Sequence, residues 1–169
     1  MIAVIIVSGI LGCRKSLLSL RKSAEDFFYS GENGDGSSIQ SDLEYIGATS
    51  NNLKTIAVRY IGADDPLIVN LSDARSALAS ARSISDKYTA AAELFDAVTV
   101  LHDSLDPSVM NSTDKNFRAS LYDDIKSAMQ RISHNGYNDA AREFNAVLEG
   151  FPAKLVAELV GIEPVQLYG

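Results

Sequence analysis

Apolar side chains recur at helical spacing along most of the chain. Between residues 38 and 61 they stand three, four or seven positions apart, at Ile39, Leu43, Ile46, Leu53, Ile56 and Tyr60. This spacing gathers them on one face of an α-helix. The same reasoning predicts further helices over residues 2–29, 66–104, 115–132, 137–151 and 153–161. Nowhere does the pattern alternate with the period of two that is typical of a strand, so we expect an all-α fold.

Turn-forming residues separate these helices. They are concentrated in residues 31–38, 62–66, 106–114 and 133–136. Glycine, asparagine and aspartate favour turns, and Pro152 stops the helix that precedes it. Thr113 or Asp114 can cap the helix that follows the third of these stretches. The last stretch is either a kink or a weak turn between helices.

The longest predicted helix covers residues 66–104. Its apolar, small and aromatic positions are spaced by threes and fours from Leu71 to Leu101, which gives a heptad-like stripe over four heptads. We expect one continuous helix that packs closely against a partner helix. Long helices joined by short loops predict an elongated antiparallel helical bundle.

The N-terminal segment differs from the rest in charge. Residues 2–12 carry no charged side chain, and Arg14, Lys15, Arg21 and Lys22 follow without an acid among them. Residues 23–169 hold 11 bases and 22 acids, and the formal net charge of all 169 residues is −7. Basic residues beside an apolar run are typical of membrane segments and of their cytoplasmic side. We therefore predict a membrane-anchor helix in residues 1–22 and a helical bundle in residues 23–169, with the bundle facing the cytoplasm.

The apolar run is short for this role. Eleven helical residues rise about 16 Å, whereas a bilayer core needs about 20 residues. Continuing to Leu20 gives about 19 positions, if Arg14 and Lys15 snorkel toward headgroups. Three interpretations follow: a short, tilted or truncated anchor, a signal segment, or the first turns of a buried helix. Cys13 after Gly12 resembles a lipoprotein cleavage site and is a candidate lipidation site, although no base precedes the run as in a signal peptide.

The chain offers little catalytic chemistry. A single cysteine excludes a disulfide framework, and the acidic net charge disfavours a nucleic-acid partner. His102 and His134 are the two histidines, and neither has a second histidine at metal-binding spacing. The glycine-rich stretch 31–36 lacks the lysine and hydroxyl residue of a phosphate-binding loop. We expect no enzyme activity, no catalytic residues, no cofactor and no metal site.

The C-terminal third carries a more specific pattern. Arg131 precedes Tyr-Asn-Asp-Ala-Ala-Arg-Glu-Phe-Asn at 137–145, and Phe151-Pro152 precedes Leu155 and Gly161. This arrangement resembles the LemA family. Further matches are Leu20-Arg21 with Glu25, Asn52-Leu53, Ala74-Arg75 and Asn116-Phe117. The chain departs from the family pattern in the loop at 31–38 and in three residues, which are Phe28 for a tryptophan, Asn51 for a proline and Gly136 for a bulkier residue.

The resemblance implies a bacterial membrane protein with one N-terminal segment, a long helical bundle and no established catalytic activity. We expect a protein-interaction or scaffold module at the cell membrane that is able to form homo-oligomers through its long helices. The signature residues expected to act in structure or interaction are Tyr137, Asn138, Asn145, Phe151, Pro152, Leu155 and Gly161. Two alternatives stay open: a lipidated or secreted surface protein, and a ligand-binding protein with a polar pocket near Tyr137, Asn138 and Asn145.

The last predicted helix carries an apolar stripe of its own. Phe151, Leu155 and Leu159 would form an exposed apolar patch if the segment 151–161 stood free. We therefore expect this segment to pack back onto the bundle through these three side chains.

Overall fold

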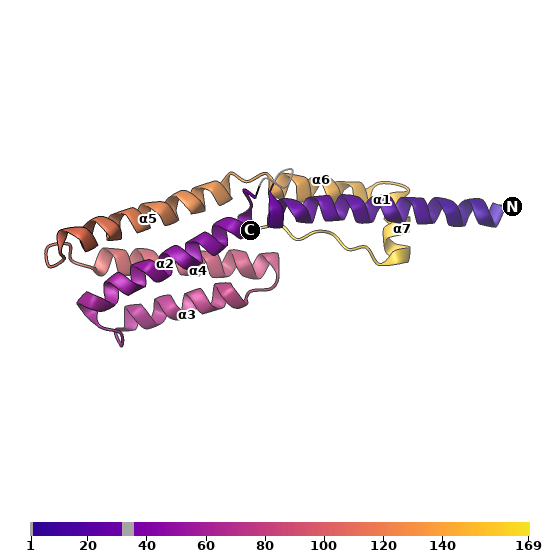
Figure 1. Cartoon of the computed structure of the whole chain (residues 1–169). Coiled ribbons are helices and arrows are strands. Elements are labelled where there is room, and N and C mark those ends of the chain that lie inside the picture. The colour runs from indigo at the N-terminus through magenta and orange to yellow at the C-terminus, as the bar shows by residue number, and fades with distance from the viewer. Residues whose placement is uncertain (1, 32–35) are drawn as a thin grey trace. The chain divides into compact units, whose positions relative to one another are not determined.

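The computed structural model describes residues 2–31 and 36–169, with side chains from residue 10 onward. Its helices are α1 (Ile2–Ser30), α2 (Ile39–Ile61), α3 (Pro66–Ser80), α4 (Ile84–Ser104), α5 (Ser112–Ser133), α6 (Tyr137–Glu149) and α7 (Ala153–Val160) (Figure 1). No strand occurs within these described ranges, which confirms the all-α prediction. The predicted break at 31–38 lies partly outside them, and α1 and α2 end and begin at its two sides.

The helices form two compact units. One unit contains α1, α6 and α7, from residues up to 38 and residues 135–167. The other contains α2 to α5, from residues 39–134 together with the last two residues. The sequence predicts a boundary at residue 22 between a membrane anchor and the bundle, and this stays a prediction. The compact units instead change after residues 38, 134 and 167.

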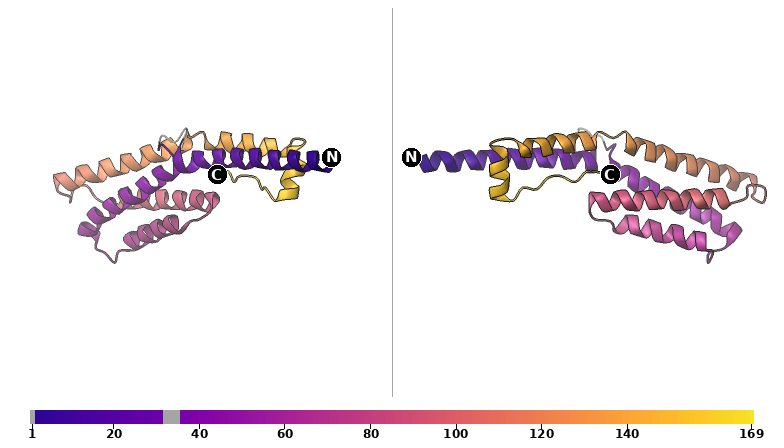
Figure 2. Two further views of the ribbon diagram at one scale, coloured as in Figure 1. Left: turned by 45° about the vertical axis from the view of Figure 1, so that its right-hand side comes forward. Right: turned by 180° about the vertical axis from the view of Figure 1, so that it is seen from behind.

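The unit of α2 to α5 has a continuous apolar core. Helix α2 packs along α5, and α3 packs along α4 (Figure 2). Its most deeply buried side chains are Ile46, Leu53, Leu71, Leu94, Val98, Leu101 and Ile125. Burial of one such side chain stabilises the fold by about 1.5–3 kcal/mol. The stripe predicted for residues 38–61 supplies the α2 part of this core.

The predicted single helix over 66–104 is wrong, because α3 ends at Ser80 and α4 begins at Ile84. Ala81 has an extended backbone, with φ −62° and ψ 126°. The Ser83 side chain accepts a hydrogen bond from the Asp86 backbone N–H at 2.9 Å, and the Asp86 carboxylate accepts one from the Ser83 N–H at 3.4 Å. This reciprocal capping box starts a new helix, so the two halves of the stripe pack on each other.

The start of α5 differs from the sequence prediction, and the stretch between α5 and α6 refines it. Asn111 caps α5, since its side-chain oxygen accepts from the Asp114 N–H at 2.8 Å, whereas Thr113 and Asp114 lie inside the helix. The stretch 133–136 separates two helices and is therefore a turn. Asn135 supports it by accepting a hydrogen bond from the Tyr137 N–H at 2.9 Å.

The unit of α1, α6 and α7 is built from both ends of the chain. Helices α1 and α6 lie side by side, α7 lies across their direction, and residues 161–167 then run back along them in extended form (Figures 1 and 2). The buried face of α1 carries Leu17, Ala24 and Phe28. The Phe28 ring meets the Tyr137 ring edge to face, with centroids 5.3 Å apart.

Within the described residues, no helix combines the length and the apolar character needed to cross a bilayer. The N-terminal anchor helix stays a prediction from the sequence.

Candidate functional site

Two signature residues of α6 hold the extended segment 161–167, which we call the C-terminal tail. The Asn145 side chain accepts a hydrogen bond from the Val165 N–H at 2.8 Å and donates one to the Val165 carbonyl at 3.0 Å. The Tyr137 hydroxyl donates to the Gln166 carbonyl. A side-chain amide thus pairs with one residue of extended backbone as a neighbouring strand would. We call these contacts the tail clasp.

Tyr137 is fully buried within its unit. Burial, with smaller contributions from Glu25 and Tyr29, raises the pKa of Tyr137 to about 12. The hydroxyl is therefore protonated at neutral pH and able to donate its hydrogen bond to the Gln166 carbonyl. A phenol in this state cannot serve as a general base.

The structure brings together only some of the predicted signature residues. Tyr137 and Asn145 meet at the tail, and Asn138 is half-buried on the same helix. The predicted polar pocket at these residues is occupied by the tail backbone, to which the Tyr137 hydroxyl and the Asn145 amide are bonded. Gly161 ends α7 in the left-handed conformation at φ 69°, which lets the chain turn back into the tail.

The segment 151–161 packs back onto α1 and α6 as predicted, but Phe151, Leu155 and Leu159 do not supply the contact. Their side chains are 85%, 59% and 69% exposed, and we call them the apolar flank of α7. Helix α7 does contact α1 and α6, but it does so through Val156 and Ala157. Beyond the turn at Gly161, Ile162 and Val165 are buried. Pro152, at the start of α7, is exposed as well.

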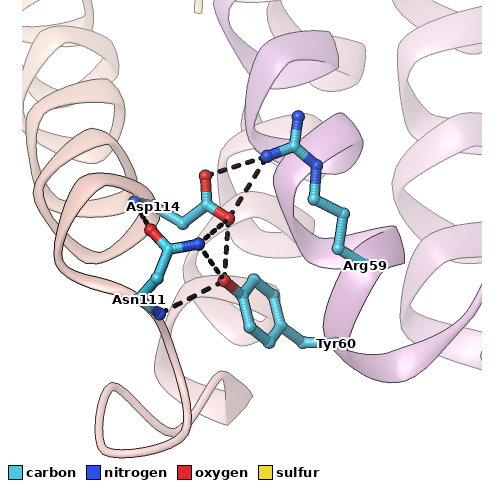
Figure 3. Close-up of polar contacts among 4 residues, drawn as sticks. All are labelled: Arg59, Tyr60, Asn111 and Asp114. Atoms are coloured by element: carbon cyan, nitrogen blue, oxygen red, sulfur yellow. Dashed lines mark hydrogen bonds and ion pairs between the residues drawn. The ribbon is translucent and has the colours of Figure 1, made fainter.

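The other unit contains a polar cluster where α2 ends and α5 begins, the helix junction of Arg59, Tyr60, Asn111 and Asp114 (Figure 3). Its centre is the buried carboxylate of Asp114, which accepts from the Tyr60 hydroxyl at 2.7 Å and the Asn111 amide at 2.9 Å. Arg59 donates to both carboxylate oxygens, at 2.9 and 3.2 Å. The carboxylate is therefore fully surrounded by donors.

Electrostatics keep both acidic groups of the helix junction in one state at neutral pH. The hydrogen bond from Tyr60, assisted by Asn111 and Arg59, lowers the pKa of Asp114. The same hydrogen bond raises the pKa of Tyr60. Neither group titrates near neutrality, so the junction ties two helix ends together. The sequence pattern does not predict this junction, because it places Tyr60 in an apolar stripe. The Asn-x-x-Asp spacing at 111–114 is a capping signal that could have indicated the α5 side of the junction.

A cleft of about 370 Å³ lies among α2, α3 and α4. Its cationic side chains are Arg75 and Lys87. Arg75 donates to the Gly47 carbonyl at 3.0 Å and to Asn51 at 2.9 Å, and Lys87 donates to Gln40. Burial lowers the pKa of Lys87. The volume would admit a small ligand, but the cations that would hold it bind the protein itself.

The two histidines and the cysteine lie outside the helix junction and the tail clasp. His102 stacks on Tyr122 with centroids 4.0 Å apart, and His134 lies beside the Gln130 carbonyl at 2.8 Å. Cys13 is a half-exposed free thiol of α1. Across the described ranges, no three side chains of the metal-binding types converge as a metal site would require.

The comparisons with known proteins agree with the pattern in the C-terminal third. The model of the LemA family matches residues 37–169. The match covers α2 to α7 and therefore includes the helix junction and the tail clasp, whereas α1 precedes it. The comparison with curated proteins gives no match.

Proposed function

The chain belongs to the LemA family, and from this premise we propose that it is a membrane-anchored helical protein that serves as a protein-interaction scaffold. One observation carries the proposal: the polar clusters join helices to one another, while apolar side chains are left at the surface. The helix junction joins the end of α2 to the start of α5, and the tail clasp joins the C-terminal tail to α6. A protein arranged in this way presents surfaces rather than reactive groups. It has no catalytic activity and needs no cofactor.

The anchor is α1. Its first 11 residues after Met1 carry no charge, and the helix continues without interruption to Ser30. Arg21 pairs with Glu25 at 3.0 Å, and Lys22 pairs with Asp26. Arg14 and Lys15 are exposed and closer to the apolar run. In the anchored protein these two bases snorkel to the headgroups, and the positive-inside rule places the bundle in the bacterial cytoplasm.

Fractionation of the native membrane tests the anchor. We expect the full chain to remain in membranes washed with alkaline carbonate and to be released by detergent. A variant with Ile5, Ile6 and Ile10 changed to serine should appear in the carbonate wash, and Val100→Ser, at an exposed position of α4 outside the apolar run, is the control. Carbonate release of the full chain would refute the anchor. Crosslinking in the same membranes, followed by identification of the partners, tests the scaffold role and self-association.

A second candidate, lipidation, has its own motivation in Cys13, which is a half-exposed free thiol directly after Gly12. A lipidated protein would be cleaved before Cys13 and held by acyl chains instead of a helix. The intact mass of the protein from native membranes separates the two: an uncleaved chain supports the helical anchor, and a chain that begins at acylated Cys13 supports lipidation. The ligand-binding alternative requires the tail to leave Tyr137 and Asn145.

A further inference from the structure

Helix α7 has two unlike exposed sides. Successive helical residues are about 100° apart, so Leu155 and Leu159 fall on one side of the buried face and Lys154 and Glu158 on the other. Lys154 pairs with Glu149 at 2.9 Å, so the cation on the charged side has an acidic partner. The apolar flank, which includes Phe151 just before the helix, has no such cover. An amphipathic helix of this kind suits a boundary between water and an apolar medium.

The orientation of α7 matches that of an interfacial helix. Figures 1 and 2 show α7 lying across α1, while α1 continues past it toward the N-terminus. The two helices belong to the same compact unit and contact each other directly. If α1 enters a bilayer, a helix that crosses it lies along the membrane surface. One side of α7 then faces the lipid and the other faces water.

Charge favours the same surface. Arg14 and Lys15 are exposed on α1, and in the described ranges neither forms an ion pair, whereas Arg21 and Lys22 are neutralised within α1. Arg14 stands one helical turn before Leu17, the first side chain of the buried face of α1. The basic pair is therefore close in sequence to the α1 surface against which the unit packs, and it complements anionic headgroups.

A second copy of the chain fits the apolar flank less well. The three side chains expose on the order of 400 Å² together, and a stable interface buries about 800 Å² on each partner. Insertion into an interface has no such minimum, because each buried CH₂ contributes independently.

We propose that α7 is an interfacial helix, with Phe151, Leu155 and Leu159 inserted at the acyl boundary and Arg14 and Lys15 at anionic headgroups. This inference rests on the proposed anchoring of α1 and adds a second membrane contact. It also compensates for the short apolar run, because α7 holds α1 at a fixed depth. In this arrangement, the side of α7 that carries Leu155 and Leu159 would face the bilayer.

Fluorescence of a single introduced tryptophan tests the depth of α7, because the chain contains no tryptophan of its own. The full chain with Leu159→Trp is reconstituted in vesicles of phosphatidylethanolamine and phosphatidylglycerol. Lipids brominated at a shallow or a deep acyl position then quench residues that reach them. Glu158→Trp is the matched control on the charged side of the same helix, and circular dichroism checks that both variants fold.

We expect Leu159→Trp to emit at shorter wavelength than Glu158→Trp and to be quenched at least about threefold more by shallow brominated lipid. Changing both Arg14 and Lys15 to glutamine should reduce this quenching. If the chain floats with the vesicles but both tryptophans respond alike to an aqueous quencher, the interfacial helix is refuted and the anchor stands. If the chain does not float, the anchoring itself fails. A blue shift that is insensitive to brominated lipid and disappears on dilution in lipid would assign the flank to a second copy and overturn the proposal.

Discussion

At the scale of single residues, the buried polar groups act by hydrogen bonds whose state does not change at neutral pH. Asp114 stays ionised among its donors, and Tyr137 stays protonated in an apolar site. The family pattern in the sequence includes Tyr137 and Asn145, but it does not predict that they bind backbone groups of the tail. These contacts depend on the turn at Gly161, and a single glycine is its only signal in the sequence.

Tyr137→Phe removes the hydroxyl while keeping the buried ring. We expect the free energy of unfolding at pH 7 to fall by about 1 kcal/mol, the net contribution of one hydrogen bond. The pKa of Tyr137 is raised from its ordinary value of 10.0 to about 12. Its contribution to stability is therefore complete below pH 10 and is lost as the pH rises toward 12.

Urea unfolding of the wild type and of Tyr137→Phe between pH 7 and 12 measures this contribution. The stability difference should shrink or reverse between pH 10 and 12. Tyr45→Phe, an exposed aromatic residue of α2 that does not contribute to the pKa of Tyr137, controls for general alkaline effects. A difference that stays constant over this range would contradict the assignment.

Asp114→Asn removes the charge at the centre of the helix junction. The folded protein lowers the pKa of Asp114 from 3.8, so its stabilising effect is present above about pH 4 and is lost as the pH falls below. We expect the variant to melt at lower temperature at pH 7 and to lose less stability than the wild type between pH 4 and 2. Thermal melts against pH test this, with the exposed Asp123→Asn as control. Equal acid sensitivity of wild type and variant would count against the junction.

At the scale of helices, periodicity predicted which faces are buried better than it predicted where helices end. From Leu71 to Leu101 the apolar positions keep their spacing of three and four residues across residues 81–83, so the spacing alone predicts one helix. The break depends on hydrogen bonds between Ser83 and Asp86, a short-range signal that apolar spacing does not contain. Capping boxes should therefore be read together with apolar stripes.

Ser83→Ala tests the capping box directly. Loss of the cap leaves the Asp86 N–H without its partner and should lower the free energy of unfolding by about 1 kcal/mol. Urea unfolding followed by circular dichroism measures it. Ser85→Ala, an exposed serine two residues further on, should change stability by less than about 0.5 kcal/mol. Equal effects of the two substitutions would show that the cap does not define α4.

At the scale of the whole molecule, the sequence predicted an all-α fold but not which helices pair. An apolar stripe marks the face that α1 buries, and many helices could cover it. The pairing with α6 and α7 depends on long-range complementarity such as Phe28 against Tyr137. The apolar flank was assigned to the core for the same reason, since hydrophobicity indicates a preference for burial and not the partner.

Removal of residues 162–169 tests how the tail contributes to the whole molecule. The deletion removes the buried Ile162 and Val165 and leaves Tyr137 and Asn145 without partners. We expect the melting temperature to fall by at least about 5 °C. Phe151→Ser, at an exposed position, should leave the melt unchanged. Equal melting of the truncated and full chains would show that the tail does not support the fold.

The construction of one unit from both chain ends has a consequence for biosynthesis. Helix α1 is synthesised before α2 to α5, but α6 and α7, which pack on it, leave the ribosome only after those helices. Contacts so distant in sequence form late. During most of translation the face of Leu17 and Phe28 is therefore uncovered and available to chaperones or to the insertion machinery. The order of synthesis would therefore give the proposed anchor time to be delivered before α6 and α7 pack on α1.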